Sequence, residues 1–166
     1  AWTWEHQALT RARFVCGDAA IQTAFERIRS EILTLPRDSA ALKNDILAMR
    51  EKIAAAHPPQ DNDVKYARGG IVDVEFAVQY LILAHARELP ALLDNYGNIA
   101  LLDTAAENGL ADPSRAYRRF RACQHSAVLD EAQPPAADSE TLSAYAAVRD
   151  LQRQIFGADG EAEEAV

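Results

Sequence analysis

A long apolar stretch in the middle of the chain constrains the fold more than any other feature. Residues 71–86 read Ile-Val-Asp-Val-Glu-Phe-Ala-Val-Gln-Tyr-Leu-Ile-Leu-Ala-His-Ala, so a helix formed there is apolar on nearly every side. Such a helix needs other elements around most of its surface. We therefore expect a central helix near residues 70–88, enclosed by the rest of the chain.

The remaining sequence predicts further helices of the same bundle. Apolar residues recur at helical spacing, as Ile21, Phe25, Ile28 and Ile32 do, and turn residues separate the segments. We expect helices over residues 3–15, from a cap at Asp18 to Pro36, from a cap at Ser39 to His57, and over residues 98–108, 114–129 and 139–156. No strand pattern competes, apart from a short extended piece at 63–66. The prediction is an all-α bundle of six or seven helices.

The domain organisation follows from length and composition. A chain of 166 residues fits one domain, which we place at residues 1–156, followed by an acidic tail at 157–166 that we expect to be disordered. The first residues already resemble structured sequence, and no methionine precedes them. We therefore expect a fragment of a longer protein.

Charge and cysteine content exclude several classes of function. The net charge of −8 argues against a nucleic-acid surface. Polar residues such as Asp73 and Gln79 interrupt the longest apolar run, so no membrane partner is expected. Cys16 and Cys123 lack metal-ligand spacing. They predict free, mostly buried thiols in a reducing compartment, and hence a cytoplasmic protein.

Two carboxylates interrupt the central helix near its start. On a helix, residues two apart differ by about 200° in direction, so Asp73 and Glu75 should point to opposite sides and cannot share a metal ion. Asp61 and Asp63 fit a solvated turn. We therefore predict no metal site, and no catalytic residue, because no nucleophile–base pair is visible.

Glu75 and Gln79 share one helix face and need polar partners if that face is internal. Candidate partners are basic: Lys65, Arg68, Arg11, Arg13, Arg118 and Arg121. One interpretation is a buried network that fixes the register of the bundle. The other is functional: basic side chains and the amides after Gly69-Gly70 would face a phosphate or another acidic group.

The central stretch and its flanks together carry a family resemblance. They are Trp4-Glu5-His6-Gln7-Ala8-Leu9-Thr10-Arg11-Ala12-Arg13, Gly17-Asp18, Lys65, Gly69-Gly70-Ile71-Val72-Asp73-Val74-Glu75-Phe76 and Gln79-Tyr80-Leu81. This combination resembles the bacterial glutamine synthetase adenylyltransferase family. The resemblance is to the helical domain that follows the second, C-terminal nucleotidyltransferase head, and it runs from Trp4 to about Phe156. Tyr66-Ala67-Arg68 and Gln124 depart from the family pattern.

The resemblance implies a bifunctional parent enzyme. It would attach AMP from ATP to a tyrosine of glutamine synthetase, remove it by phosphorolysis, and respond to the PII signal protein and glutamine. ATP and Mg²⁺ are implied for the parent. This chain lacks the Gly-Ser and Asp-x-Asp motifs of a catalytic head, so it is predicted to bind no cofactor alone and to be inactive alone. The implied partners are the upstream head, glutamine synthetase and PII.

The residues expected to face the substrate or the head are Lys65, Arg68, Gly69, Gly70, Asp73, Glu75, Arg11 and Arg13. Two alternatives stay open. The chain could be a docking module for PII or glutamine synthetase that makes no nucleotide contact. It could also be the helical domain of a PII uridylyltransferase, in which a looser version of the same motif occurs.

Overall fold

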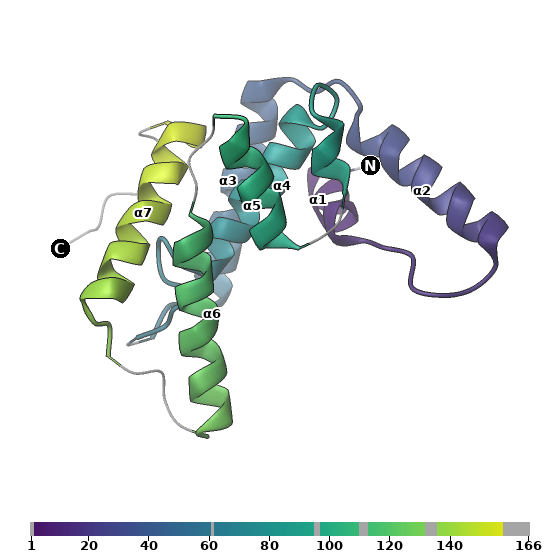
Figure 1. Cartoon of the computed structure of the whole chain (residues 1–166). Helices are drawn as coiled ribbons and strands as arrows, with labels where there is room; N and C mark the ends of the chain where they lie inside the picture. The colour runs from purple at the N-terminus through teal and green to yellow at the C-terminus, as the bar shows by residue number, and fades with distance from the viewer. Residues whose placement is uncertain (1, 61, 95–96, 110–112, 132–135, 158–166) are drawn as a thin grey trace.

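A computed structural model describes residues 2–60, 62–94, 97–109, 113–131 and 136–157. These residues form seven α-helices and one short 3₁₀ helix, and none of them lies in a strand (Figure 1). In chain order the elements are α1 (Thr3–Arg11), α2 (Ala19–Leu33), α3 (Ser39–Ala56), α4 (Ile71–His85), η1 (Pro90–Leu93), α5 (Asn98–Glu107), α6 (Ser114–Leu129) and α7 (Ser139–Phe156). The prediction of an all-α helical bundle is confirmed.

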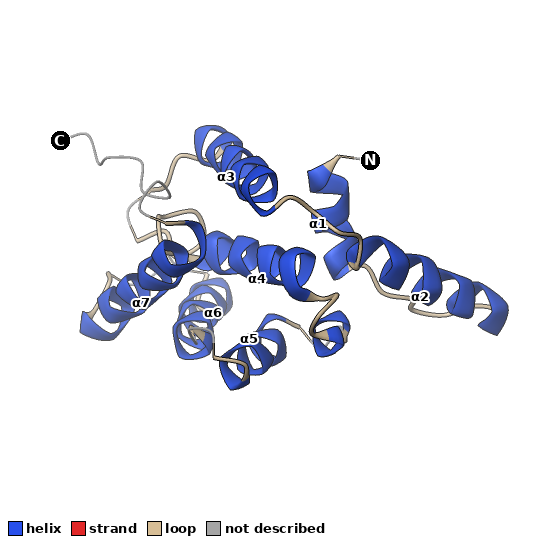
Figure 2. Ribbon diagram, turned by 90° about the horizontal axis from the view of Figure 1, so that it is seen from above, coloured by secondary structure: helices blue, strands red, loops and turns tan. Residues whose placement is uncertain are grey.

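The predicted central helix is α4. It packs against α1, α3, α5, α6, α7 and η1. Seen from above, it lies between α3 on one side and α5 and α6 on the other (Figure 2). The residues of α4 that are not buried are Glu75, Gln79, Ala84 and His85. As its nearly all-apolar sequence predicts, α4 is covered by other elements on nearly all sides.

Capping residues set several helix boundaries. Asp18 accepts a hydrogen bond from the Ala20 amide at 2.7 Å, as the sequence predicts. At α3 the cap is Asp38, which accepts from the Ala41 amide at 2.7 Å, whereas Ser39 is already helical. The expected Ser39 cap is therefore wrong by one residue. Both residue types favour this position, so composition alone does not separate them.

The first helix is shorter than predicted. It ends at Arg11 rather than near Val15, because the backbone turns extended at Ala12. The guanidinium of Arg29 donates to the carbonyl oxygens of Leu9 and Thr10, at 3.3 and 3.1 Å. These terminal carbonyls thus find a partner in α2, and a further turn of α1 is not needed to satisfy them.

Three further expectations change. Residues 63–66 form turns rather than an extended piece, because the Asp63 carboxylate accepts from the amides of Lys65 and Tyr66 at 2.8 and 3.1 Å. The sequence did not predict η1. Cys123 is buried, but Cys16 is exposed. Asp61, residues 110–112 and 132–135, and residues 158–166 of the expected tail lie outside the described residues.

No helix among the described residues is long and apolar enough to cross a membrane.

Candidate functional site

The glycine pair and the first turn of α4 are built around the buried carboxylate of Asp73. Asp73 is completely buried and Arg50 is 2% exposed. One Asp73 oxygen accepts from Arg50 Nε, and the other accepts from the Gly69 amide at 2.5 Å. Arg50 Nη2 also donates to the carbonyl oxygen of Tyr66 at 2.9 Å. The Arg50–Asp73 pair therefore ties α3, the loop before α4 and the start of α4 together.

Both glycines are required by close backbone approaches. Gly69 has φ +82°, and a Cβ placed there would lie 2.7 Å from the carbonyl oxygen of Tyr145 in α7. A Cβ on Gly70 would lie 2.6 Å from the carbonyl oxygen of Val64. Contacts this short leave no room for a side chain. The Gly-Gly sequence thus lets the loop pack against α7 and fold back on itself.

The first amides of α4 already have partners. The Ile71 amide donates to the carbonyl of Val64 at 2.9 Å, and the Val72 amide donates to the carbonyl of Lys65 at 3.1 Å. A helix N-terminus binds an anion through amides that lack an internal acceptor. These two amides are not available for that purpose, so the loop carbonyls take the place that a phosphate would occupy.

The basic residues of the loop lie on the α3 side of α4. Lys65 is exposed, and its ammonium group lies 4.7 Å from the centre of the Tyr66 ring. Tyr66 in turn stacks on His57, with ring centres 4.6 Å apart. Arg68 forms an ion pair with Glu51 of α3 at 2.5 Å. Lys65 is therefore the cation of this loop that points to solvent without a carboxylate partner among the described residues.

A second polar cluster lies on the other side of α4, and we call Arg11, Glu75, Asn98 and Tyr117 the Asn98 cluster. Asn98 is 4% exposed and donates to the Tyr117 hydroxyl at 2.9 Å. Its amide nitrogen also lies 3.5 Å from Glu75 Oε1, while its amide oxygen accepts from Arg11. The cluster joins α1, α4, α5 and α6, as expected for a buried network that fixes helix register.

The structure does not gather the eight predicted residues in one place. Asp73 points toward α3 and Glu75 toward α5 and α6, in agreement with their angular separation on the helix. Lys65 and Arg68 lie on the first side, and Arg11 lies on the second. The remaining three are the buried Gly69 and Gly70, and Arg13, which is exposed in the loop after α1.

Sequence reasoning missed Arg50, Asn98 and Tyr117. Arg50 follows Ile46 by four residues, so it shares the apolar face of α3. A cation on such a face requires a buried acceptor, and that signal was present in the sequence. Asn98 was identified only as a helix start, and nothing in the local sequence distinguishes a buried asparagine there from an exposed one.

Comparison with known proteins was then decisive. A profile of the glutamate–ammonia ligase adenylyltransferase family matches residues 1–28. A bifunctional glutamine synthetase adenylyltransferase/adenylyl-removing enzyme of Neisseria meningitidis is 59% identical over 163 residues, which is 95% of this chain and 18% of the relative. The corresponding enzymes of Chromobacterium violaceum and Aromatoleum aromaticum are 56% and 50% identical, over 94% and 95% of this chain and 18% of each relative.

The chain corresponds to a segment of this adenylyltransferase family. It spans about a fifth of the length of the curated relatives that it matches, since each match covers 18% of the relative. The resemblance first noted in the glycine-pair motif is thereby confirmed over nearly the whole chain.

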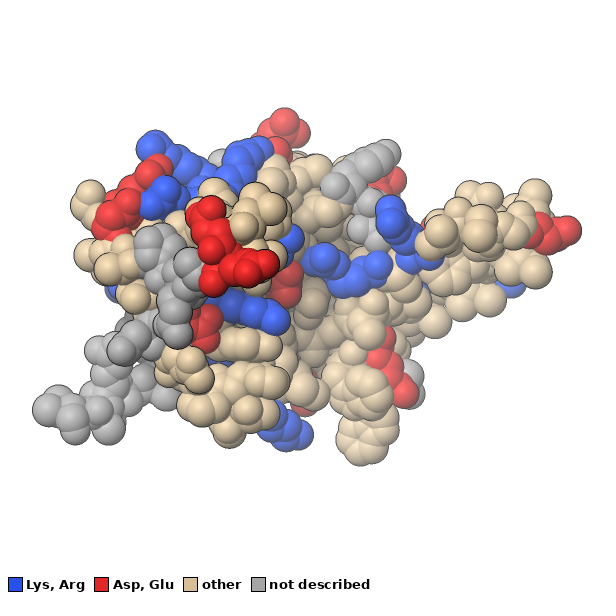
Figure 3. Space-filling view, turned by 90° about the horizontal axis from the view of Figure 1, so that it is seen from below, with Lys and Arg blue, Asp and Glu red and all other residues tan. Residues whose placement is uncertain are grey.

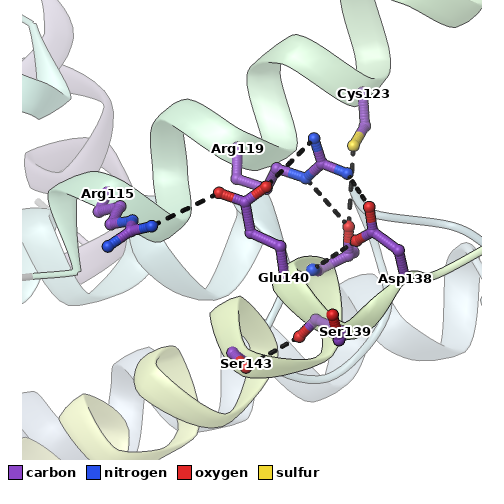
Figure 4. Close-up of polar contacts among 8 residues, drawn as sticks. Arg115, Arg119, Cys123, Asp138, Ser139, Glu140 and Ser143 are labelled. Atoms are coloured by element: carbon purple, nitrogen blue, oxygen red, sulfur yellow. Dashed lines mark hydrogen bonds and ion pairs between the residues drawn. The ribbon is translucent and has the colours of Figure 1, made fainter.

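A groove of about 740 Å³ lies between α6 and α7. Figure 4 shows polar contacts that join these two helices. Arg119 donates to Asp138 at 2.6 Å and to the Thr141 hydroxyl at 3.2 Å. The backbone amide of Thr141 donates to Asp138 and holds the pKa of that carboxyl below its usual value. Glu140 lies 3.7 Å from Arg115 and 3.6 Å from Arg119. These arginines face carboxylates of α7, so the arrangement joins two helices.

Two observations bear on ligands. Within the described ranges, no group of three or more His, Cys, Asp or Glu side chains is placed to hold a metal ion. On the face seen from below, acidic and basic side chains are interspersed and do not form a patch of one sign (Figure 3). We assign no metal-dependent step to the described residues.

The Asn98 cluster is directly testable. We expect Asn98→Ala to lower the free energy of unfolding by about 2 kcal/mol, because the buried Tyr117 hydroxyl and the half-buried Glu75 carboxylate each lose a polar partner. Asn44→Ala, at an exposed position of α3, should change it by less than about 0.5 kcal/mol. Urea denaturation of both variants measures the difference. Equal losses would contradict the assignment of a structural network.

Proposed function

We propose that this chain is the helical domain that supports the adenylylating head of a glutamine synthetase adenylyltransferase. The observation that carries the proposal is the 50–59% identity to bifunctional relatives over about 95% of the chain. In this proposal the head precedes the chain in the same polypeptide and binds ATP and Mg²⁺, and glutamine synthetase is the protein substrate. PII regulates the cytoplasmic parent enzyme, and the residues described above supply no catalytic group.

We further propose that the Lys65 side of the 65–75 segment, with Arg13, faces the active-site cleft of the head. Arg11 and Glu75 lie on the other side of α4, in the Asn98 cluster, so this contact does not include them. Lys65 and Arg13 are exposed and cationic, so they could meet ATP phosphate or an acidic surface of glutamine synthetase. The buried members of the segment act indirectly. The Arg50–Asp73 pair and the glycine pair fix the loop that presents Lys65.

The test is adenylylation by the full-length enzyme. We expect Lys65→Ala to lower kcat/KM roughly tenfold, as the loss of one charge-assisted contact would. Lys52→Ala, which removes an exposed lysine of α3, is the matched control and should leave kcat/KM unchanged. Melting curves verify that each variant is folded. Unchanged kinetics for folded Lys65→Ala would refute the cleft-facing position.

A docking module without nucleotide contact is the second candidate. It is favoured by the internal hydrogen bonds of the Ile71 and Val72 amides, which remove the most evident phosphate site. Calorimetry on the isolated chain separates the two candidates. Affinity for glutamine synthetase or PII without affinity for ATP would support docking. The high identity to adenylyltransferases argues against the uridylyltransferase alternative.

A further inference from the structure

Helix α2 projects from the bundle and carries an uncovered apolar face. In both ribbon views it extends away from the other helices, and α1 is its main contact (Figures 1 and 2). We call Ile21, Phe25, Ile28 and Ile32 the α2 stripe, since their spacing places them on one face. Ile21 is 62% exposed and Ile28 is 46% exposed. Seen from below, the projecting arm carries few charged side chains (Figure 3).

The orientation of α2 is fixed by other residues. Arg29, which is 5% exposed, donates to carbonyl oxygens of α1 and, at 2.8 Å, to that of Leu93 in η1. Leu33 is completely buried. Because successive helical residues are about 100° apart, the α2 stripe lies roughly 90° around the helix from these two anchors. Arg29 and Leu33 therefore fix the rotation of α2 about its axis. In this orientation the α2 stripe faces solvent.

The relatives are much longer than this chain, which bears on what covers this face. The profile match ends at residue 28, within α2. Among the described residues, five of the nine strongly exposed large apolar side chains lie in these 28 residues: Trp2, Trp4, Val15, Ile21 and Ile28. The chain spans only 18% of the length of the Neisseria meningitidis relative. The longer enzyme therefore contains much further polypeptide that could cover the α2 stripe.

We propose that the α2 stripe docks, within the longer enzyme, against an apolar surface of the same polypeptide that lies outside these 166 residues. This rests on the proposed function, because it assumes the longer parent. The proposal also says where the head contacts this chain: at α2, away from the Lys65 loop.

The size of the stripe favours an intramolecular partner over a second copy of the chain. Full burial of an aromatic side chain such as Phe25 removes only about 150–250 Å² from water, and an isoleucine side chain is smaller. Four partly covered side chains therefore fall short of the roughly 800 Å² per partner of a stable interface. A segment tethered to the same chain needs far less area, because its effective concentration reaches the millimolar range.

Hydrogen–deuterium exchange tests this, with the full-length enzyme compared with the 166-residue chain. We expect α2 amides to exchange at least about tenfold more slowly in the full-length enzyme. Ile21→Ser with Ile28→Ser should remove that protection there and leave exchange in the short chain unchanged. The matched control is Val128→Ser with Leu129→Ser, at side chains 71% and 82% exposed on α6, which should not alter α2.

Two results would overturn the proposal. One is equal α2 exchange in both proteins. The other is protection in the short chain that rises with concentration together with a doubled mass in sedimentation, which would identify a second copy as the occupant. The kinetic test of Lys65→Ala is independent of both. If α2 is protected but the kinetics of Lys65→Ala are unchanged, the cleft-facing position is refuted and the docking face stands. If α2 is unprotected but Lys65→Ala lowers kcat/KM, only the docking face is refuted.

Discussion

Asp73→Ala should lower the free energy of unfolding by about 3–5 kcal/mol, because it leaves the Arg50 guanidinium charged and buried without its carboxylate partner. The Gly69 amide loses its acceptor at the same time. Urea denaturation of the 166-residue chain measures the loss. Glu51→Ala, which breaks the solvent-accessible ion pair with Arg68, is the matched control and should cost less than about 1 kcal/mol.

A double-mutant cycle identifies the source of the Asp73 effect. Arg50→Met removes the buried cation and keeps an apolar stem of similar length. Combined with Asp73→Ala, it should cost clearly less than the sum of the two single substitutions, since no buried charge is then left unpaired. Additive losses would show that the two side chains act separately, and would contradict the role given to their contact.

The sequence determined the centre of this fold because α4 is apolar on nearly every side. Such a helix must be enclosed, and the helical spacing of the flanking segments then predicts the all-α bundle. Angular geometry also predicted correctly that Asp73 and Glu75 point to opposite sides. Boundaries were less predictable. The end of α1 depends on Arg29, a residue in the next helix, and local pattern cannot show a tertiary contact.

At the candidate site, too, the local sequence did not reveal the tertiary contacts. Local spacing marked Asp73 as unusual but could not name Arg50 as its partner, since that contact spans 23 residues of sequence. The α2 stripe has the periodicity of a core-facing helix, yet Ile21 and Ile28 remain largely exposed. Periodicity shows that a face is apolar and does not show which surface covers it.

Gly70→Ala should lower the free energy of unfolding by about 3 kcal/mol. The new Cβ would lie 2.6 Å from the Val64 carbonyl oxygen and 2.9 Å from that of Ala67, and both are backbone atoms of the loop that accepts the first amides of α4. Relief of these contacts requires the loop to move away from the helix. Such a movement would displace Lys65, so we expect adenylylation by the full-length enzyme to fall as well.

Gly109→Ala separates this steric effect from backbone strain. Gly109 has φ +86°, but no described residue beyond its chain neighbours has an atom within 4 Å of the position that a Cβ would take, so alanine there should cost only the left-handed penalty of about 1 kcal/mol. Gly70 does not have a positive φ, so the free energy of unfolding lost in Gly70→Ala would come from the steric contacts alone. Urea denaturation of the two variants gives the comparison. A loss at Gly70 no larger than that at Gly109 would mean that the loop yields easily, and that the glycine pair does not hold the Lys65 segment in place.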